Sequence, residues 1–346
     1  MYRKLSADIL FNGHEILPGE TVLVLNPDGS VANLIPSSEA GEDIEVFEGM
    51  LTPGFVNCHC HLELSHMKGS LPRNTGLVPF LEGVMQQRQA EEPEILEAIA
   101  AAETEMYATG IVAVGDICNT THTLPGKSTS KLLYHNFIEV AGFPEYVAEK
   151  RFLAAKELYE QFAVLGNNRS IVPHAPYSVS KSLLEKIVSF PDNEIMTMHN
   201  QESVDEQRWF EDKSGGFAGF YEKLGIAVDG FTAPGTSGFR SFLPHFRLNR
   251  PLILVHNLHI SQADISYAQT MYDREDAPLY FCLCPHANEY ISGQCPDPNL
   301  FLRNGMKIVL GTDSLASNSQ LNIWEEIQLL RKAHPDIALA EMLRWA

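Results

Sequence analysis

The chain has 346 residues, of which 45% are hydrophobic and 20% are charged, so it can bury a sizeable core and is not expected to be disordered. It carries 44 acidic against 25 basic residues, which gives a formal net charge of −19. Because nucleic acids and anionic membranes bind cationic surfaces, this balance argues against either as the main partner.

The cysteines and the N-terminal residues indicate an intracellular protein. The first residues, MYRKLSADILFNG, do not have the pattern of a secretory signal. In a chain of this length the thiols are therefore expected to be reduced rather than paired in disulfides. No apolar run approaches the ~18 residues of a membrane span, so we expect a cytoplasmic location. The six cysteines are Cys58, Cys60, Cys118, Cys282, Cys284 and Cys295.

The first fifty residues differ in pattern from the remainder. The short runs ADILFNGHEIL, ETVLVLNPDGSVANLI and IEVFEGM have the composition of strands. Asn-Gly and Pro-Asp-Gly turn signals lie within them. The sequence thus predicts a small β module over residues 1–50, ahead of a larger domain over residues 51–346.

From residue 51 onward, apolar strand-like runs alternate with helix-like segments. Eight such runs would close a parallel (β/α)8 TIM barrel, and their β-branched character suits strands that are buried on both faces. The expected strands are MLTPGFVNCH (50–59), GIVAVGDI (110–117), LLYHNFIEV (132–140), SIVPHA (170–175), EIMTMHN (194–200), PLILVHN (251–257), LYFCLCP (279–285) and MKIVLGTDS (306–314).

Helix signals occur between several of these strands. The run PEYVAEKRFLAAKELYEQFAVLG has Pro144 at its start and Gly166 at its end, as helix boundaries usually do. The run SKSLLEKIVSF offers Ser180 as an N-cap, and LNIWEEIQLLRKA follows the last strand. The long segment 205–246 is rich in glycine and aromatic residues, which predicts a loop region that covers the substrate or, alternatively, an inert insertion.

The first barrel strand ends in the unusual run GFVNCHCHLEL. Residues two apart in a strand project to the same side, so His59 and His61 share one face and Cys58 and Cys60 share the other. Histidines that point into the barrel mouth would form a pair of metal ligands. The alternative is a structural zinc site of cysteines, completed by the thiols of the CLC run. It is disfavoured because such sites usually space their cysteines as C-x₂₋₄-C.

The carboxyl ends of other strands also carry metal-ligand side chains. Strand four ends in His174, strand five in His199, strand six in His256 and strand eight in Asp313. Each of these histidines alone is more often a structural residue. Barrel active sites, however, lie at the carboxyl ends of the strands, so we expect these side chains to converge.

A mononuclear metal site follows from this convergence. The predicted ligands are His59, His61, His199 and Asp313, with a water molecule in the open position. Nitrogen and oxygen donors suit Zn²⁺, with Fe²⁺ as the alternative. Water bound at such a cation becomes a hydroxide nucleophile near neutral pH. No lysine ends strand four or five to bridge a second ion, so one cation is expected.

The run HNQES adds a candidate acid–base residue. Glu202 lies three residues after His199, just past the strand end. A carboxylate there can carry a proton from water to a leaving group. The alternative interpretation is a glutamate that is favoured at the start of a helix by the helix dipole.

Five motifs together resemble the amidohydrolase superfamily, in its cytosine, guanine and adenosine deaminase and chlorohydrolase branch. They are PGFVNCHCHLE, HAPYSVS, HNQES, LVHNLH and VLGTDSLASN, and they span nearly the whole chain in the family's order. The resemblance implies a TIM barrel with a small β-sandwich module. It supports the four metal ligands proposed above.

The resemblance also implies roles for individual residues. Glu202 looks like the proton shuttle to a ring nitrogen, and His256 like the residue that orients the attacking hydroxide. Asp313 would double as a base toward that water. Residues expected to contact the substrate, or to lie just behind those that do, are His174, Ser314 and Asn318.

The implied activity is hydrolytic deamination of an amino-substituted heterocycle, in which an activated hydroxide displaces ammonia. The substrate is expected to be adenosine-like and is most similar to that of aminodeoxyfutalosine deaminases. Two alternatives stay open, namely hydrolysis of a cyclic amide or of a chloride on the same site, and a metal-stabilised barrel without activity. A cyclic-amide substrate would call for an arginine, and Arg73, Arg240 and Arg303 are available.

The chain departs from the family pattern at two places. The family's CP-x-S-N run is CPHAN here, with His286 and Ala287, which changes one side of the pocket. The last residues, AEMLRWA, lie within an expected helix, whereas relatives continue with further strands of the β-sandwich module. We therefore expect that module to be incomplete in this chain. A homodimer is the expected assembly.

Overall fold

The computed structural model describes residues 2–246, 250–271 and 279–346. It divides into two compact units, one of Met1–Phe55 with Pro335–Ala346 and one of Val56–His334. The proposed division at residue 50 into a β module and a hydrolase barrel stays a prediction. Among the described residues, no helix combines the length and the apolarity needed to cross a membrane.

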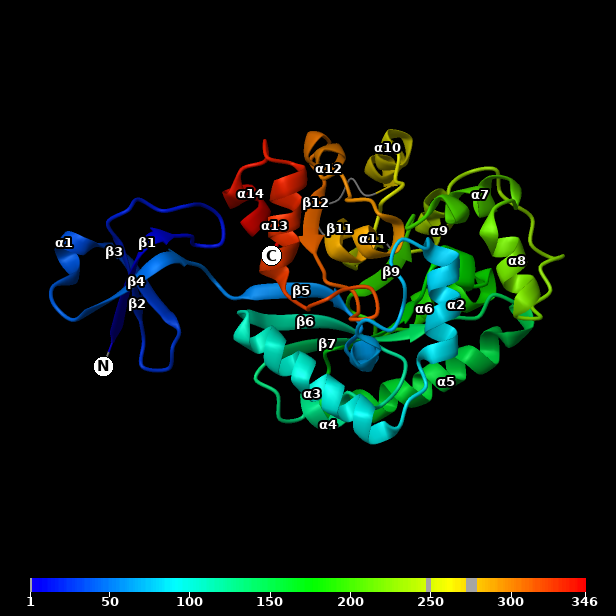
Figure 1. The fold of residues 1–346 in the computed structure, drawn as a ribbon, viewed down its shortest axis with the longest axis horizontal. Helices are drawn as coiled ribbons and strands as arrows, with labels where there is room; N and C mark the ends of the chain where they lie inside the picture. Colours follow the sequence, from blue (N-terminus) through cyan, green and yellow to red (C-terminus); the bar gives the residue numbers. More distant parts are fainter. Residues whose placement is uncertain (1, 247–249, 272–278) are drawn as a thin grey trace. The chain divides into compact units, whose positions relative to one another are not determined.

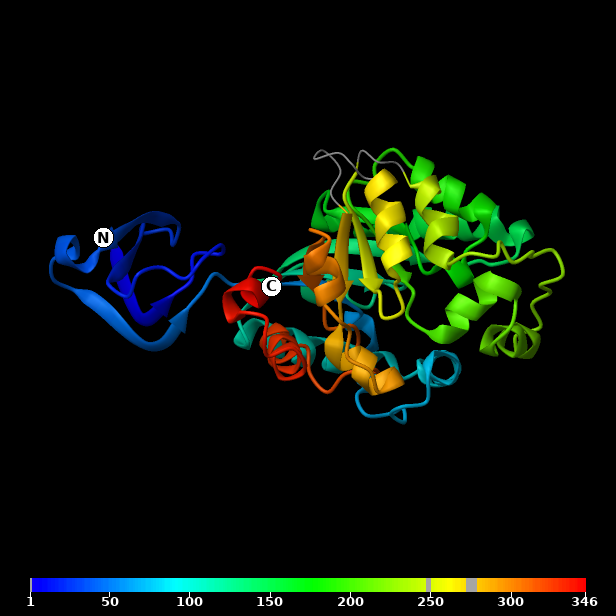
Figure 2. The same ribbon diagram turned by 90° about the horizontal axis from the view of Figure 1, so that it is seen from above.

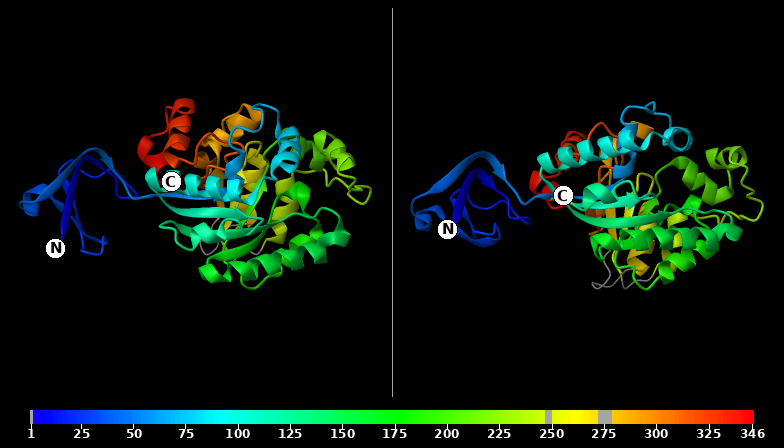
Figure 3. Two further views of the ribbon diagram at one scale, coloured as in Figure 1. Left: turned by 60° about the horizontal axis from the view of Figure 1, so that its bottom comes forward. Right: turned by 90° about the horizontal axis from the view of Figure 1, so that it is seen from below.

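The first unit is built on one four-stranded sheet, drawn in blue in Figure 3. Its strands stand in the order β3-β2-β1-β4, and β1 pairs antiparallel with β2 but parallel with β4. Val22 and Leu5 are buried within this unit. Its elements are β1 (Arg3–Leu10), β2 (Thr21–Leu25), β3 (Val31–Pro36), α1 (Ser37–Ala40), β4 (Ile44–Leu51) and α14 (Leu339–Leu343).

The second unit contains eight parallel strands in chain order, as two four-stranded sheets, β5-β6-β7-β8 and β9-β10-β11-β12. The sheets join at both seams. His199 N donates to His174 O (2.9 Å) between β8 and β9, and Thr312 N donates to His59 O (3.0 Å) between β12 and β5. All eight predicted strands are present, as β5 (Phe55–Cys60), β6 (Ile111–Cys118), β7 (Leu133–Val140), β8 (Arg169–Pro173), β9 (Met196–Asn200), β10 (Leu252–His256), β11 (Leu279–Leu283) and β12 (Lys307–Leu310).

Helices follow the strands and lie outside them, as α3, α5 and α13 show in Figure 1 and the view from above shows in Figure 2. The longer ones are α2 (Leu77–Gln87), α3 (Glu92–Ala108), α5 (Ala148–Gln161), α6 (Lys181–Ser189), α10 (Gln262–Met271), α11 (Pro285–Ser292) and α13 (Ile323–Ala333). Shorter helices are η1 (Leu62–Met67), α4 (Leu124–Lys127), η2 (Glu145–Val147), η3 (Phe162–Leu165), η4 (Pro176–Ser178) and α12 (Asn299–Arg303).

The predicted helix boundaries agree with the structure. Ser180 precedes α6, and its side chain accepts a hydrogen bond from Leu183 N, as an N-cap should. The helical run after Pro144 continues through η2, α5 and η3 and stops at Gly166, whose φ of 100° favours glycine. The run after the last strand forms α13.

The loop region predicted for residues 205–246 is wrong in its secondary structure. The segment is largely helical, with α7 (Val204–Asp212), α8 (Gly216–Lys223), α9 (Gly238–Phe242) and η5 (Leu243–His245). Its aromatic side chains pack into one apolar cluster with η1, α2 and Tyr177, around the buried Trp209. Glycines suggested a loop, but aromatic burial stabilises short helices here, because tertiary packing outweighs local propensity.

A buried ion pair connects β6 to the end of β5. Lys127 Nζ lies 2.5 Å from Asp116 Oδ2 and 2.7 Å from Asn136 Oδ1, and the Lys127 side chain is 1% exposed. The second oxygen of Asp116 accepts the backbone N–H of Leu62 at 2.8 Å. Leu62 directly follows His61, so this carboxylate fixes the backbone beside a predicted metal ligand.

Replacing Asp116 by alanine should lower the free energy of unfolding by about 3–5 kcal/mol, because the Lys127 ammonium would stay buried without its counter-ion. Chemical denaturation of the wild type and the variant measures this loss. The double variant Asp116→Ala/Lys127→Met should recover most of it. As a control, Glu105→Ala removes the exposed partner of Lys68 and should cost less than about 1 kcal/mol. Equal losses of unfolding free energy for Asp116→Ala and Glu105→Ala would contradict the assignment of Asp116 and Lys127 as a stabilising buried ion pair.

Candidate metal centre and active site

The site lies where β5, β9, β10 and β12 end. His199 stands in register with Val255, Cys282 and Val309 across β9 to β12, so these side chains share the inner face of the sheet. Beside His199, Val255 and Cys282 form an apolar cluster with Cys284 and Ala287. The polar side chains therefore lie next to apolar ones at the carboxyl rim, where the sequence predicts the site.

Gly311 makes room for the first histidine. A Cβ atom at this position would lie 2.8 Å from His59 Cβ and 2.9 Å from Cys282 Sγ, both closer than real Cβ atoms approach. The absence of a side chain lets β12 approach β5, and His59 O accepts the backbone N–H groups of Thr312 and Asp313. Asp313 is thus brought beside His59 by the closure of the barrel.

Two of the site residues have left-handed backbone conformations. His256 has a φ of 74° and Asp313 a φ of 57°, a region that non-glycine residues rarely adopt. Asn257, at a φ of 56°, stabilises the first of these turns through its side-chain amide, which donates to Leu254 O (2.7 Å) and Cys282 O (3.2 Å). Such conformations persist where the surrounding structure enforces them, and they cluster at functional sites.

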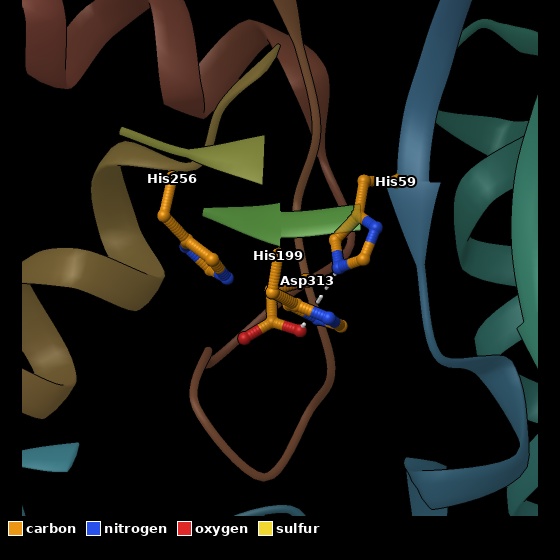
Figure 4. A group of neighbouring side chains, drawn as sticks. All are labelled: His59, His199, His256 and Asp313. Atoms are coloured by element: carbon orange, nitrogen blue, oxygen red, sulfur yellow. Dashed lines mark ion pairs between the residues drawn. The ribbon is translucent and has the colours of Figure 1, made fainter. Parts of the chain in front are cut away.

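The predicted ligand atoms converge on one point. His61 Nε2 lies 3.2 Å from His59 Nε2 and 3.3 Å from His199 Nε2. Asp313 Oδ1 lies 3.4 Å from His61 Nε2 and 3.6 Å from His59 Nε2. Figure 4 shows His59, His199 and Asp313 pointing toward one another, together with His256. All of these side chains are buried.

These separations suit a divalent cation. Four donors at 2.0–2.1 Å around a tetrahedral Zn²⁺ are about 3.3–3.4 Å from one another, close to the distances seen here. Neutral imidazole nitrogens at such distances repel through their lone pairs unless a cation or a proton lies between them. Three nitrogens and one carboxylate oxygen form a donor set that zinc and iron accept.

Electrostatics keep these donors in the state that a metal requires. Burial lowers the pKa of His61 to about 3, so its imidazole is neutral. Burial alone would raise the pKa of Asp313, but its interactions with His59, His61 and His256 outweigh burial, and the pKa lies well below its usual value. Neutral imidazoles and an ionised carboxylate are the ligand forms of these groups.

Neighbouring groups orient two of the ligands. His199 Nδ1 lies 2.8 Å from His174 O, so it carries the proton and leaves Nε2 free to bind a cation. Ser317 Oγ donates to Asp313 Oδ2 at 2.6 Å and leaves Oδ1 facing the histidines. Neither Ser317 nor its contact was predicted, although it lies four residues after Asp313.

A second, overlapping ligand set includes His256. Four residues each offer one donor atom, and these atoms lie within 4.8 Å of one another. The residues are His59, His199, His256 and Asp313. We favour His61 over His256 as the ligand because His61 Nε2 lies within 3.4 Å of three of these donors. Asn288 Nδ2 lies 3.3 Å from His256 Nδ1, and an amide donor there leaves the proton on His256 Nε2.

Glu202 faces the same centre. Its Oε1 lies 3.6 Å from His256 Nε2, and the side chain is 6% exposed. Burial first, and then the negative charges of Asp313 and Glu206, raise the pKa of Glu202 well above its usual value. A carboxyl that retains its proton near neutral pH can donate that proton to a bound substrate.

Two further carboxylates were missed by sequence reasoning. Glu139 ends β7 and its Oε1 lies 3.4 Å from His199 Nδ1, with a pKa that burial raises to about 7. Its place at a strand end is the same signal that identified the histidines. Glu206, in α7, was read as part of the covering loop, and no short motif points to it.

His174 lies with Glu139 and His199, outside the four predicted metal ligands. It shares a cluster of donor atoms with Glu139 and His199, and its Nδ1 lies 2.7 Å from Ser178 Oγ. Burial lowers the pKa of His174 to about 4, so the ring is neutral. The ring is partly exposed beside the centre, and its contact with a substrate stays a prediction.

The loop after β12 holds the remaining predicted residues. Ser314 Oγ lies 3.3 Å from Ser317 Oγ, within the loop. Asn318 Nδ2 donates to Thr312 O and to Glu326 Oε1, at 3.0 and 2.8 Å, so this amide supports the loop. The structure brings neither residue into the histidine cluster, and their predicted substrate contacts stay predictions.

Cys58 and Cys60 lie in different surroundings, and their common face stays a prediction. Cys58 packs against the apolar cluster around Cys282, whereas Cys60 is buried among Asp116, Lys127 and Thr312. Among the described residues, no group of metal-ligand side chains contains a cysteine, and the cysteines are unpaired in disulfides.

Comparisons with known proteins agree with this geometry. The sequence model of the Amidohydrolase family matches residues 50–346. An adenosine deaminase from Helicobacter pylori is 24% identical over 300 residues, which cover 85% of this chain and 71% of that protein. An aminodeoxyfutalosine deaminase from Nitratiruptor sp. is 27% identical over 294 residues, which cover 83% of this chain and 69% of that protein.

Solved structures share the fold. The Helicobacter pylori aminofutalosine deaminase, in complex with methylthio-coformycin, superposes with a TM-score of 0.84 at 22% identity and covers 99% of this chain and 84% of its own. That likeness confirms the predicted α/β barrel. Because the family model covers most of the sequence and the site residues lie within it, the chain belongs to the amidohydrolase family.

Proposed function

We propose that this chain is a metal-dependent hydrolytic deaminase of an adenosine-like substrate, with His59, His61, His199 and Asp313 as the metal ligands. The observation that carries the proposal is the convergence of these four donors, with His61 3.2–3.4 Å from each of the other three, beside the buried Glu202, whose pKa is raised. A structural cation would not require an acid–base carboxyl at its edge. The relatives named above are deaminases of adenosine-type compounds.

A divalent cation held by these ligands supplies a Lewis acid that lowers the pKa of a bound water molecule. We infer Zn²⁺, with Fe²⁺ as the alternative. His256 donates a hydrogen bond through Nε2 and so orients the water oxygen. Asp313 would accept a proton from that water, because its pKa is held low and Ser317 donates to its second oxygen.

Glu202 then completes the proton transfers. Its carboxyl protonates the ring nitrogen next to the carbon that bears the amino group, which makes that carbon more electrophilic. The water oxygen would then bond to that carbon, and the proton accepted by Asp313 would pass to the amino group. The C–N bond would break to release ammonia, and the remaining hydroxyl proton would return to Glu202. His174, beside His199, is the proposed contact to the heterocycle, with Ser314 and Asn318 behind it.

The arginines give no support to the cyclic-amide alternative. Arg73 stacks over the Tyr290 ring, and Arg240 pairs with Asp264 at 2.8 Å, so both guanidinium groups are engaged within the protein. Arg303 ends α12, at the amino end of β12 and thus at the rim opposite the site. A cytoplasmic homodimer is the expected form of the enzyme.

Removal of the cation should abolish ammonia release. After dialysis against a chelator, turnover of adenosine or an adenosine analogue should fall to background, and added Zn²⁺ or Fe²⁺ should restore it. Metal content is measured alongside by elemental analysis, and about one ion per chain is expected. Full turnover in a metal-free preparation would contradict the proposed centre.

Exchange of Glu202 for glutamine should lower kcat by about 10²- to 10⁴-fold, because the amide cannot transfer a proton. The metal content should stay unchanged, since Glu202 is not a ligand. Glu222→Gln, an exposed residue of α8, is the matched control and should retain wild-type turnover. Steady-state ammonia assays measure both variants, and an active Glu202→Gln enzyme would remove this residue from the mechanism.

Substrate preference should separate the candidates within the family. We expect ammonia release from adenosine, methylthioadenosine or aminodeoxyfutalosine at a higher kcat/KM than from guanine or cytosine. An enzyme-coupled ammonia assay across these five compounds measures the order. Consumption of a cyclic amide without ammonia release would replace deamination by the cyclic-amide alternative.

A further inference from the structure

The backbone that presents Glu202 is held by another carboxylate. Glu206 Oε1 accepts the backbone N–H of Gln201, and Glu206 Oε2 accepts the backbone N–H of Glu202, both at 3.1 Å. Gln201 has a φ of 46°, so the chain turns sharply between β9 and Glu202. One side chain thus binds two consecutive amides of a turn that a non-glycine residue rarely makes.

Glu206 is itself firmly placed. It lies in the first turn of α7, where Ser203 Oγ accepts its backbone N–H at 3.1 Å, and its side chain is buried. Helix α9 covers it, because a Cβ on Gly238 would lie 3.2 Å from Glu206 Oε1. A buried carboxylate is costly unless it is hydrogen-bonded, and the two backbone amides satisfy that requirement.

The other side of the same turn is also anchored. Gln201 Nε2 donates to Asp264 Oδ2 at 3.1 Å, and Gln201 O accepts His259 N at 2.9 Å. Asp264 Oδ1 accepts Ser237 Oγ and Arg240 Nε, at 2.7 and 2.8 Å, from the chain around α9. The turn is therefore held between α7 and α10, while the aromatic cluster packs α7 against α8.

We propose that Glu206 is a positioning residue for the deamination, which holds the Gln201–Glu202 turn so that the Glu202 carboxyl faces the metal centre. This inference rests on the proposed function, in which Glu202 carries the proton. Among the described residues, Glu206 makes no hydrogen bond with the ligand cluster or with the carboxyl of Glu202, and it holds the turn through the two backbone amides. A displacement of about 1 Å at a catalytic group can lower a rate by about 10²-fold.

The first test compares Glu206→Gln with the wild type. The amide keeps one acceptor oxygen but turns an N–H toward the second backbone amide, so one of the two hydrogen bonds is lost. We expect kcat to fall by about 10- to 100-fold, with KM, metal content and Tm close to wild type. Glu211→Gln, an exposed residue of the same helix, is the control and should retain wild-type kcat.

A double-mutant cycle separates positioning from a general structural role. If Glu206 acts through Glu202, Glu206→Gln should lower kcat in the wild type but have no further effect in Glu202→Gln. An equal loss in both backgrounds, or a wild-type kcat for Glu206→Gln, would overturn the inference while leaving the proposed function intact. Full activity of Glu202→Gln alone would instead overturn the proposed function, and this inference with it.

If Glu206→Gln does not fold, Gly238→Ala gives the same test without a change of charge. The added methyl group presses on Glu206 Oε1 and on Phe210 Cδ2, which lie 3.2 and 3.1 Å from its position. We expect a loss of kcat at unchanged KM that again disappears in the Glu202→Gln background. Persistence of the loss in that background would reject positioning.

Discussion

The repulsion among converging lone pairs is the constraint on which this site depends. The Nε2 atom of His61 lies 3.2–3.4 Å from a nitrogen of His59, a nitrogen of His199 and an oxygen of Asp313, all in a buried setting. Burial keeps His61 neutral, and His199 has its proton on the outer nitrogen, so neither can relieve the contact by donating inward. A cation at the centre turns this unfavourable contact into coordination, which explains why buried polar groups collect at one rim of an otherwise apolar barrel.

The barrel meets this constraint through its closure and through local strain. The seam between β12 and β5 brings Asp313 to His59, and Gly311 removes the side chain that would keep these strands apart. Left-handed conformations at His256 and Asp313 then turn their side chains inward. Each such conformation costs about 1–3 kcal/mol and is maintained by hydrogen bonds such as those of Asn257.

The carboxyl groups of Asp313 and Glu202 lie in different environments around the centre, and their pKa values are therefore shifted in opposite directions. Imidazoles near Asp313 hold its pKa low, as the proposed proton acceptor requires, whereas burial holds the pKa of Glu202 high, as the proposed proton donor requires. Glu206 lies behind the turn at Gln201 and Glu202. Its two hydrogen bonds to backbone amides connect the helical segment 204–246 to Glu202. The segment that looked like a loop is thus part of the support of the site.

The sequence by itself determined the eight strands, three of the helices and the identity of the converging histidines, because apolar runs, caps and strand-end polar residues are local signals. The same rule, which looks for polar residues at strand ends, would also have identified Glu139. The different surroundings of Cys58 and Cys60, the helical nature of residues 205–246 and the role of Glu206 were decided only by the tertiary structure. Burial among distant neighbours, aromatic packing and long-range hydrogen bonds depend on which segments of the chain meet, and no local pattern encodes those meetings.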